Sequence, residues 1–271
     1  MIINIFFLAT IIAGITGIYF CLKADKKNPK KRAPKAGPLA LVLLLIIIAS
    51  TIAILVRAAL SDVRDERFIS DELIYSRASG YMLGRSLGKS FPGYDALIIT
   101  HDKNSANTLL DASLEGLREG LGRKVKIAAI DSPIPTQSKK KETTKIFPER
   151  MLYLSRKMEA DNFDQVIEKY PECNLIISLI GLPKDPHKMS ILNIMPEKRA
   201  KLAILSSNIS MLKDRISQGD ISAAVINRPG YIPGNEIIPK DIESAFDKRF
   251  LLVTPDNVKL VASEHPSIFK K

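Results

Sequence analysis

The 271-residue sequence contains no tryptophan, only two cysteines and only three histidines. Two cysteines cannot build the disulfide framework that holds many small secreted domains together. The histidines lie far apart in the sequence, and no cysteine or histidine recurs at the spacing of a zinc site. We therefore expect no metal and no cofactor. We expect Cys173, which precedes an apolar run, to be a small buried residue.

Complete nucleotide-binding and nucleophile motifs are also missing. Gly84 to Gly88 matches the nucleophile-elbow pattern of α/β-hydrolases, but a helical pattern precedes it and a strand pattern follows it, which reverses the required order. A phosphate-binding loop that ends at Gly88 would need a glycine at position 83, where the chain has leucine. Gly80, Gly84 and Gly88 instead recur every four residues, which predicts a smooth helix face for the close approach of another helix or of the sheet.

Charged residues are absent from two long stretches near the start of the sequence, residues 1–22 and residues 36–56. A helix of about 21 residues is roughly 32 Å long, enough to cross a hydrocarbon core of about 30 Å. Residues 1–10 also lack the Lys or Arg with which a secretory signal peptide begins. The sequence therefore predicts two transmembrane helices within residues 1–60.

A basic loop at residues 23–38 separates these stretches, with seven Lys or Arg, one acid and three prolines. Cytoplasmic loops collect Lys and Arg, so we expect this loop in the cytoplasm. The first residues and everything after about residue 60 would then lie outside it, at the cell (inner) membrane. A patch that binds lipid headgroups or nucleic acid is the alternative reading of the loop.

Most of the net charge of +11 comes from this loop. Residues 1–58 hold eight of the 40 Lys and Arg and one of the 29 Asp and Glu, which leaves 32 bases and 28 acids beyond them. A nucleic-acid-binding module should carry a concentrated basic face on its folded domain. We therefore expect no nucleic-acid partner.

Short apolar runs alternate with helical patterns over residues 91–271. Runs of Ile, Leu and Val that are too short for helices are typical of strands buried on both faces, and intervening helices indicate a mostly parallel sheet. We expect a doubly wound α/β domain of about six strands with helices on both faces, preceded by a juxtamembrane helix or stalk at residues 61–90. The predicted strands are 96–100, 125–130, 175–180, 202–205, 223–226 and 250–253, and the predicted helices are 106–121, 148–169, 210–218, 241–248 and 257–264.

Ligands of doubly wound domains bind at the carboxyl ends of the strands, where loops and helix starts converge. Polar residues follow the predicted strands here, and they suit a small polar ligand. Helix capping and turns are the alternative role for each of them. The predicted ligand-binding residues are Thr100, His101, Asp102, Asn104, Asp131, Ser132, Gly181, Ser206, Asn208, Asn227 and Arg228. No catalytic residue is predicted, because adjacent residues such as His101 and Asp102 point to opposite faces of an extended chain.

Three segments carry a resemblance to a known family. The first segment begins with a strand at Leu97 to Thr100, continues through Asn104, Ser105 and the helical Leu114 to Arg118, and ends in a strand at 125–131. In the second, a helix at 163–170 precedes the strand at 175–180. The third, residues 221–229, is a later strand and turn. This order resembles one lobe of the type 1 periplasmic sugar-binding proteins. The resemblance implies an extracytoplasmic fold with solute recognition. The chain departs from that family because it has no second lobe and no tryptophan to stack on a sugar.

The sequence thus favours a membrane-anchored extracytoplasmic domain, without catalytic activity, that binds a small polar solute or a membrane protein partner. A structural scaffold of the cell envelope without a ligand is one alternative. A hydrolase or transferase that uses Asp102, Asp131 or Ser206 is another.

Overall fold

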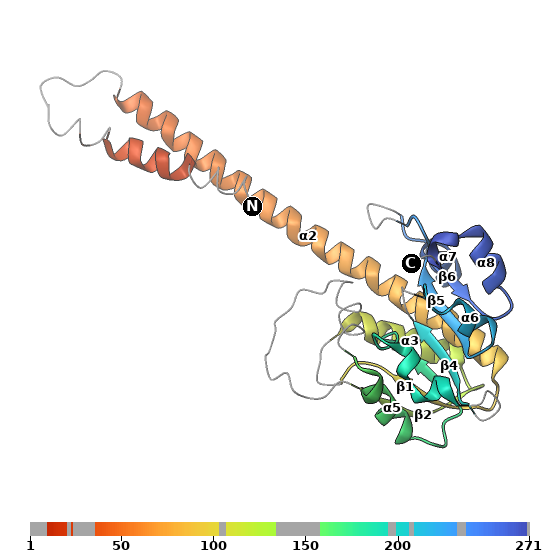
Figure 1. Cartoon of the computed structure of the whole chain (residues 1–271). Coiled ribbons are helices and arrows are strands. Elements are labelled where there is room, and N and C mark those ends of the chain that lie inside the picture. Colours follow the sequence, from red (N-terminus) through yellow and green to blue (C-terminus); the bar gives the residue numbers. More distant parts are fainter. Residues whose placement is uncertain are drawn as a thin grey trace, which may run out of the picture. The chain divides into compact units, whose positions relative to one another are not determined.

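The computed structural model of the chain (Figure 1) describes residues 10–20, 23, 36–102, 107–133, 158–194, 199–205, 209–231 and 237–269. The chain divides into two compact units, Met1–Phe68 and Ile69–Lys271. The helix α2 (Ala36–Ser90) contributes residues to both units.

Met1–Phe68 contains a pair of helices, one at residues 10–20 and the other the first part of α2. They pack closely where glycines face α2, since a Cβ added at Gly14 would lie 2.7 Å from Ile47 Cγ1 and one at Gly17 would lie 2.8 Å from Leu43 Cδ1. Within the described residues, no helix combines the length and the apolar character that crossing a membrane requires. The two transmembrane helices predicted from the sequence are therefore not supported by the structure. Most of the basic loop lies outside the described residues.

A six-stranded sheet forms the centre of Ile69–Lys271, in the order β2-β1-β3-β4-β5-β6. The first five strands are parallel, and β6 runs antiparallel to β5. The prediction of six strands in a mostly parallel sheet is confirmed, with every boundary within two residues of the predicted one. The strands are β1 (Asp95–Ile99), β2 (Lys126–Asp131), β3 (Leu175–Ser178), β4 (Lys201–Leu205), β5 (Ile221–Asn227) and β6 (Phe250–Val253).

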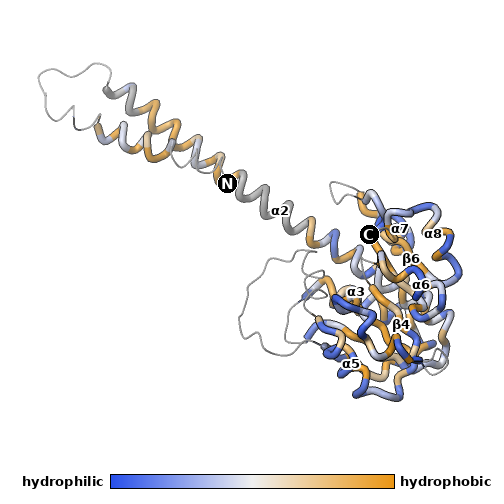
Figure 2. The backbone as a smooth tube through the Cα atoms, in the orientation of Figure 1, coloured by the Kyte–Doolittle hydropathy of each residue, from blue (hydrophilic) through white to orange (hydrophobic). Residues whose placement is uncertain are grey.

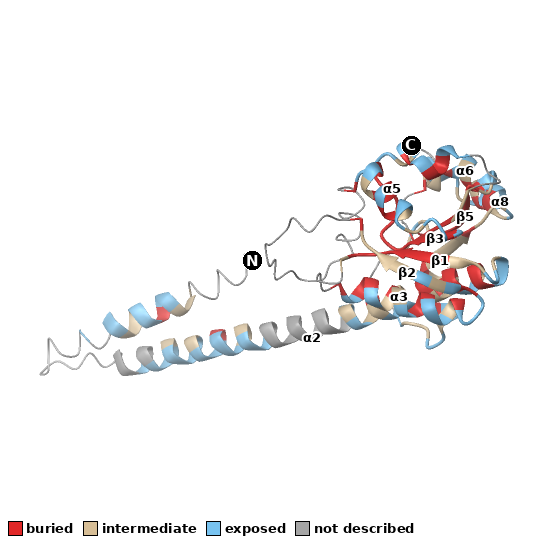
Figure 3. Cartoon of the chain, turned by 90° about the horizontal axis from the view of Figure 1, so that it is seen from below, coloured by how far each residue is buried: buried red, intermediate tan, exposed pale blue. Residues whose placement is uncertain are grey.

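Helices cover both faces of this sheet, as predicted. Figure 3 shows α3 and the end of α2 on one face and α5 and α6 on the other. The connection from β1 to β2 runs one way across the sheet and the connection from β2 to β3 runs the other way. Because both crossovers are right-handed, their helices lie on opposite faces. Besides α2, the helices among the described residues of this unit are α3 (Thr108–Leu121), α5 (Ala160–Glu168), α6 (Lys213–Ser217), α7 (Ile242–Arg249) and α8 (Val258–Glu264). The first part of the predicted helix 148–169 lies outside the described residues.

Side chains and prolines fix the ends of several elements. The Asn107 side chain accepts a hydrogen bond from the Leu110 N–H at 3.2 Å and so caps α3, while the Asp241 side chain caps α7 by accepting one from the Ser244 N–H at 2.7 Å. The link from β3 to β4 is proline-rich and forms short 3₁₀ turns, η1 (Pro186–Lys188) and η2 (Ser190–Asn193), in place of a helix. A last 3₁₀ turn, η4 (Pro266–Ile268), follows α8.

The apolar core follows the strands. Leu175, Ile176 and Ile177 of β3 have no exposed surface, and the same holds for residues 96–99 of β1. Figure 2 shows apolar residues running through the sheet while most outer turns are polar. Cys173 is buried beside β3, as predicted, and burial raises the pKa of its thiol.

Glycines on two helices allow α2 to lie directly against α3. A Cβ added at Gly80 would be 1.9 Å from the carbonyl oxygen of Ser113, and one at Gly84 would be 2.4 Å from that of Leu117. The contact is reciprocal, because a Cβ at Gly120 of α3 would be 2.1 Å from the carbonyl oxygen of Tyr81. The predicted smooth helix face is therefore confirmed, and its partner is a second glycine-bearing helix.

A buried ion pair attaches α2 to the other end of the sheet. Arg249 Nη1 lies 2.6 Å from Glu72 Oε1, and both side chains are buried. The guanidinium also lies among aromatic rings, 4.9 Å from the Tyr75 centroid, 5.1 Å from that of Tyr231 and 5.4 Å from that of Phe250. Arginine stacks well on aromatic faces, so this contact combines ion pairing with cation–π attraction.

We predict that Gly84→Ala lowers the free energy of unfolding by about 2 kcal/mol or more, because the new Cβ overlaps the backbone of α3. Gly88→Ala is the matched control, since its Cβ would lie 3.2 Å from the carbonyl oxygen of Leu121. The better helix propensity of alanine, about 1 kcal/mol, offsets that milder contact. Chemical denaturation of the full chain, followed by tyrosine fluorescence, measures both. Equal losses in the two variants would contradict the packing argument.

Candidate functional site

The carboxyl ends of β1, β2 and β3 lie together, so the structure places several of the predicted ligand-binding residues near one another. The Thr100 N–H donates to the carbonyl oxygen of Asp131 at 3.0 Å, and the Leu179 N–H donates to that of Ile99 at 2.9 Å. Thr100, His101, Asp131 and Ser132 therefore share this edge, and Gly181 lies three residues beyond β3. We call it the carboxyl edge.

Several polar groups at the carboxyl edge are already engaged within the protein. Thr100 and His101 are buried, with Thr100 Oγ1 3.4 Å from His101 Nδ1, and His101 Nε2 lies 3.7 Å from an oxygen of Asp111. The Ser178 hydroxyl donates a hydrogen bond to the carbonyl oxygen of Gly181.

The Asp131 carboxylate has three donors. It accepts from the Ser132 N–H at 2.7 Å, from Lys169 Nζ at 3.3 Å and from the Tyr170 hydroxyl at 3.3 Å. Burial raises the pKa of Asp131, but these hydrogen bonds and the Lys169 charge outweigh it, so the pKa is lowered overall. Burial first, and then the Asp131 charge, raise the pKa of Tyr170.

The other predicted residues lie elsewhere or outside the described part of the chain. Asn227 ends β5, which β4 separates from β3. Arg228 donates from Nε to the carbonyl oxygen of Asp247 at 3.0 Å and from Nη2 to that of Phe250 at 3.4 Å, so it holds the end of α7. Asp102 is half-buried after β1. Asn104, Ser206 and Asn208 lie outside the described residues. A ligand site at the carboxyl edge stays a prediction.

A hollow of about 510 Å³ lies at the opposite edge of the sheet, where β1, β3 and β4 begin. Its walls come from the last turn of α5, from η2 and from the segments that lead into these strands. We call it the amino-edge groove, and the residues that matter most below are Tyr94, Asp164, Ile167, Glu168, Ile191 and Lys201. Its volume falls within the range of about 300 to 1,000 Å³ that is typical of small-molecule sites.

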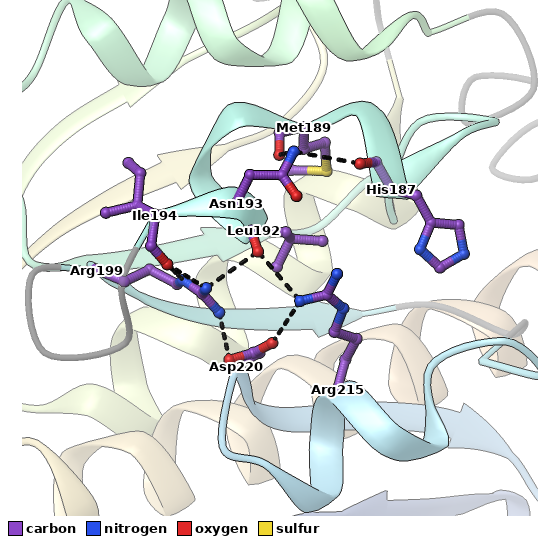
Figure 4. A network of polar contacts seen from close by, with 8 residues as sticks. All are labelled: His187, Met189, Leu192, Asn193, Ile194, Arg199, Arg215 and Asp220. Carbon is purple, nitrogen blue, oxygen red and sulfur yellow. Dashed lines mark hydrogen bonds and ion pairs between the residues drawn. The ribbon is translucent and has the colours of Figure 1, made fainter.

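One wall of the groove is fixed by two arginines and a buried aspartate (Figure 4). Arg199 forms an ion pair with one oxygen of Asp220, and Arg215 Nη1 lies 2.9 Å from the other. The same arginines donate to the carbonyl oxygen of Leu192, from Arg199 Nη2 at 3.0 Å and from Arg215 Nη1 at 3.1 Å. Asp220 is 4% exposed and Arg199 is 7% exposed. This network holds η2 against the starts of β4 and β5.

Two further side chains join the walls of the groove to each other. Asp164 of α5 accepts a hydrogen bond from the Ser190 N–H at 2.8 Å, which connects α5 to η2. Asn174 accepts one from the Asp95 N–H at 2.9 Å, which connects the entry of β3 to β1. The groove is therefore built from groups that the fold has already positioned, which lowers the entropy cost of binding.

The amino-edge groove was not predicted from the sequence, because ligands of doubly wound domains are expected at the carboxyl ends of the strands. One local signal was available, since Asp164 and Glu168 are four residues apart and therefore lie on one face of the predicted helix. The remaining groups come from segments far apart in the chain, and no local pattern connects them.

No known protein family matches this sequence, and no curated protein matches it either. Several solved structures are similar. Two of them were solved with a bound sugar, and a third is a glucose-galactose binding protein.

One of them is a periplasmic solute-binding protein of an ABC transporter from Actinobacillus succinogenes 130z with bound D-allose, at 12% identity, 68% coverage of this chain, 62% of that chain and a TM-score of 0.41. A second is a solute-binding protein of an ABC transporter from Burkholderia graminis C4D1M in complex with D-arabinose. The match has 13% identity and a TM-score of 0.40, and it covers 67% of this chain and 60% of that chain. A third is a glucose-galactose binding protein from Geobacillus stearothermophilus. The match has 12% identity and a TM-score of 0.41, and it covers 70% of this chain and 54% of that chain. This chain spans less than two thirds of the length of each of them.

We predict that Asp220→Asn lowers the free energy of unfolding by about 3 kcal/mol or more, because it leaves buried arginine charge without its carboxylate. Asp95→Asn is the control, since Asp95 pairs at 3.0 Å with a lysine that is largely exposed, and we expect little change there. Chemical denaturation of the full chain measures the free energy of unfolding of both variants. A loss in Asp220→Asn no larger than in Asp95→Asn would show that the network does not hold η2.

Proposed function

We propose that this chain is a solute-binding protein that binds a small solute in the amino-edge groove without chemical conversion, and that Met1–Phe68 anchors it in the membrane with Ile69–Lys271 outside the cytoplasm. The observation that carries the binding part is the groove itself, a preformed hollow of about 510 Å³. It combines apolar walls with a few fixed polar groups, the usual composition of a small-molecule site.

The chemistry of the groove supports binding over catalysis. Cys173 lines it and would be the natural nucleophile there, but burial raises the pKa of this thiol. A thiol with a raised pKa stays protonated near neutral pH, and the thiolate is the reactive form. Asn174 already accepts a hydrogen bond from the Asp95 N–H, so it serves first to hold the walls.

The binding proposal predicts that the full chain in detergent micelles melts at a higher temperature with at least one class in a panel of sugars, amino acids and nucleosides. Ligand binding to the folded state raises stability by mass action, so the shift should grow with ligand concentration. Ala200→Phe, which places a large ring in the groove, should abolish the shift. Asp102→Asn at the carboxyl edge should retain it.

Two outcomes would overturn this assignment. No shift with any member of the panel would remove the support for solute binding. A shift that survives Ala200→Phe and disappears in Asp102→Asn would move the site to the carboxyl edge.

Exposed apolar side chains support the membrane part of the proposal. On α2 the large apolar side chains of Leu41, Val42, Leu44, Leu45 and Ile46 are all exposed, and successive residues point to different sides of a helix. The helix at residues 10–20 exposes Ile12, Ile15, Tyr19 and Phe20 as well. A helix that is apolar on all sides suits a lipid environment, whereas a partner protein would need only one apolar stripe.

The residues next to the basic loop fit a membrane surface. Lys23 Nζ lies 5.7 Å from the centroid of the Tyr19 ring. Tyrosine and lysine are typical of the boundary between lipid and water. The seven cations of the loop support its cytoplasmic placement, and with it a position of Ile69–Lys271 on the other side.

We predict that a membrane-impermeant maleimide labels an Ile237→Cys variant in intact cells and that the labelled chain is recovered with the membranes. Ile237 is 91% exposed, so a cysteine there is accessible, and the parent chain with its two native cysteines gives the background. Adding Leu45→Lys and Ile48→Lys should move the chain out of the membrane fraction, because buried lysine is costly in lipid. Labelling only after lysis would place Ile69–Lys271 in the cytoplasm. Unchanged fractionation of the lysine variant would contradict lipid contact.

A further inference from the structure

A buried carboxylate, that of Asp164, lines the amino-edge groove. Asp164 is 8% exposed, and its Oδ2 accepts one hydrogen bond, from the Ser190 N–H at 2.8 Å. Within the described part of the chain, no lysine, arginine or histidine forms an ion pair with it. A buried charge is stable only when it is paired or well hydrogen-bonded, so this carboxylate is suited to receive a cation.

A second acid strengthens the negative potential at the same place. Glu168 lies four residues after Asp164 on α5, and both side chains line the groove. Like charges at this spacing repel each other on a helix. Glu168 also lies in the last turn of α5, where the helix dipole is negative and where the helix has no basic residue. A cation between the two acids would relieve both effects.

The neighbouring cations of the chain are bound elsewhere. Arg199 pairs with Asp220, and Lys169 Nζ lies 3.3 Å from Asp131. Lys201 lines the groove and, among the described residues, has no acidic partner. Among the charged residues that line the groove are two acids on α5, Lys201 at the start of β4, and Arg199, whose charge is paired with Asp220.

The walls between these charges are apolar. Tyr94, Ile167 and Ile191 line the groove, and each is buried or half-buried. A bare metal ion would leave this surface without a partner, whereas an organic cation would cover it.

We propose that the amino-edge groove binds a small organic ammonium compound, with its ammonium group on Asp164 and Glu168 and its apolar body along Tyr94, Ile167 and Ile191. The inference rests on the proposed function and specifies the chemical class of the solute. Free amines and amino acids share this chemistry. Only the amino acid has a carboxylate for Lys201 to bind.

The test uses the full chain in detergent micelles with three matched probes, isopentylamine, isopentanol and leucine. Isopentylamine and isopentanol have the same apolar body and differ in charge. Isopentylamine and leucine should raise the melting temperature in proportion to the logarithm of their concentration, and isopentanol should not. If leucine binds more tightly than isopentylamine in the parent chain but equally in Lys201→Gln, the site takes amino acids. Equal binding of the two probes in both chains supports free amines.

Two substitutions locate the ammonium group. Asp164→Asn keeps an oxygen that can accept from the Ser190 N–H, and Glu168→Gln changes an exposed side chain, so both variants should fold. Each should raise the apparent Kd for isopentylamine about tenfold or more, the loss expected for a charge-assisted hydrogen bond. Glu159→Gln makes the same change at the opposite, exposed end of α5 and should leave the Kd unchanged.

The failures of this inference and of the proposed function are distinguishable. Stabilisation by sugars or nucleosides that Ala200→Phe abolishes, without any effect of the ammonium probes, would overturn the ammonium assignment and leave solute binding in place. Equal stabilisation by isopentanol and isopentylamine, or unchanged binding in both acid variants, would also overturn it. No stabilisation by any probe or by any member of the solute panel would remove both.

Discussion

The shape of the amino-edge groove depends on one buried carboxylate. Asp220 balances the charges of Arg199 and Arg215, and the two arginines in turn bind the carbonyl oxygen of Leu192. Buried arginine is tolerable only when its charge and its donors are satisfied, so the ion pairs and the carbonyl contacts depend on each other. Through them, a proline-rich link without regular helix becomes a rigid wall beside β4.

The two edges of the sheet differ in how many hydrogen-bond donors their buried polar groups already have. At the carboxyl edge, Asp131 already has three hydrogen-bond donors, and Thr100 and His101 are buried against their neighbours. At the amino edge, Asp164 is buried with one backbone donor beside an open hollow. A carboxylate with a single donor next to free volume can still receive a ligand, so this contrast favours the edge that open α/β sheets less often use.

The second part of α2 belongs to the folded unit Ile69–Lys271 and has two strong attachments to it. The glycines of α2 and α3 bring the two backbones into contact, and the Glu72–Arg249 pair fixes α2 beside α7 and β6. One attachment depends on the absence of side chains, and the other depends on buried charge among aromatic rings. Together they hold α2 at both ends of the sheet.

Apolar periodicity and residue size within short segments were enough to predict the six strands of a mostly parallel α/β sheet and the glycine face of α2. The sequence also indicated the burial of Cys173 from its apolar neighbours. The antiparallel direction of β6, the structural roles of His101 and Arg228, and the amino-edge groove were decided by the tertiary structure. Tyr94, Asp164, Ile191 and Lys201 meet only because strand order and helix crossings bring separate segments together. Those distances depend on long-range packing, and so does the burial of Asp164 beside the hollow.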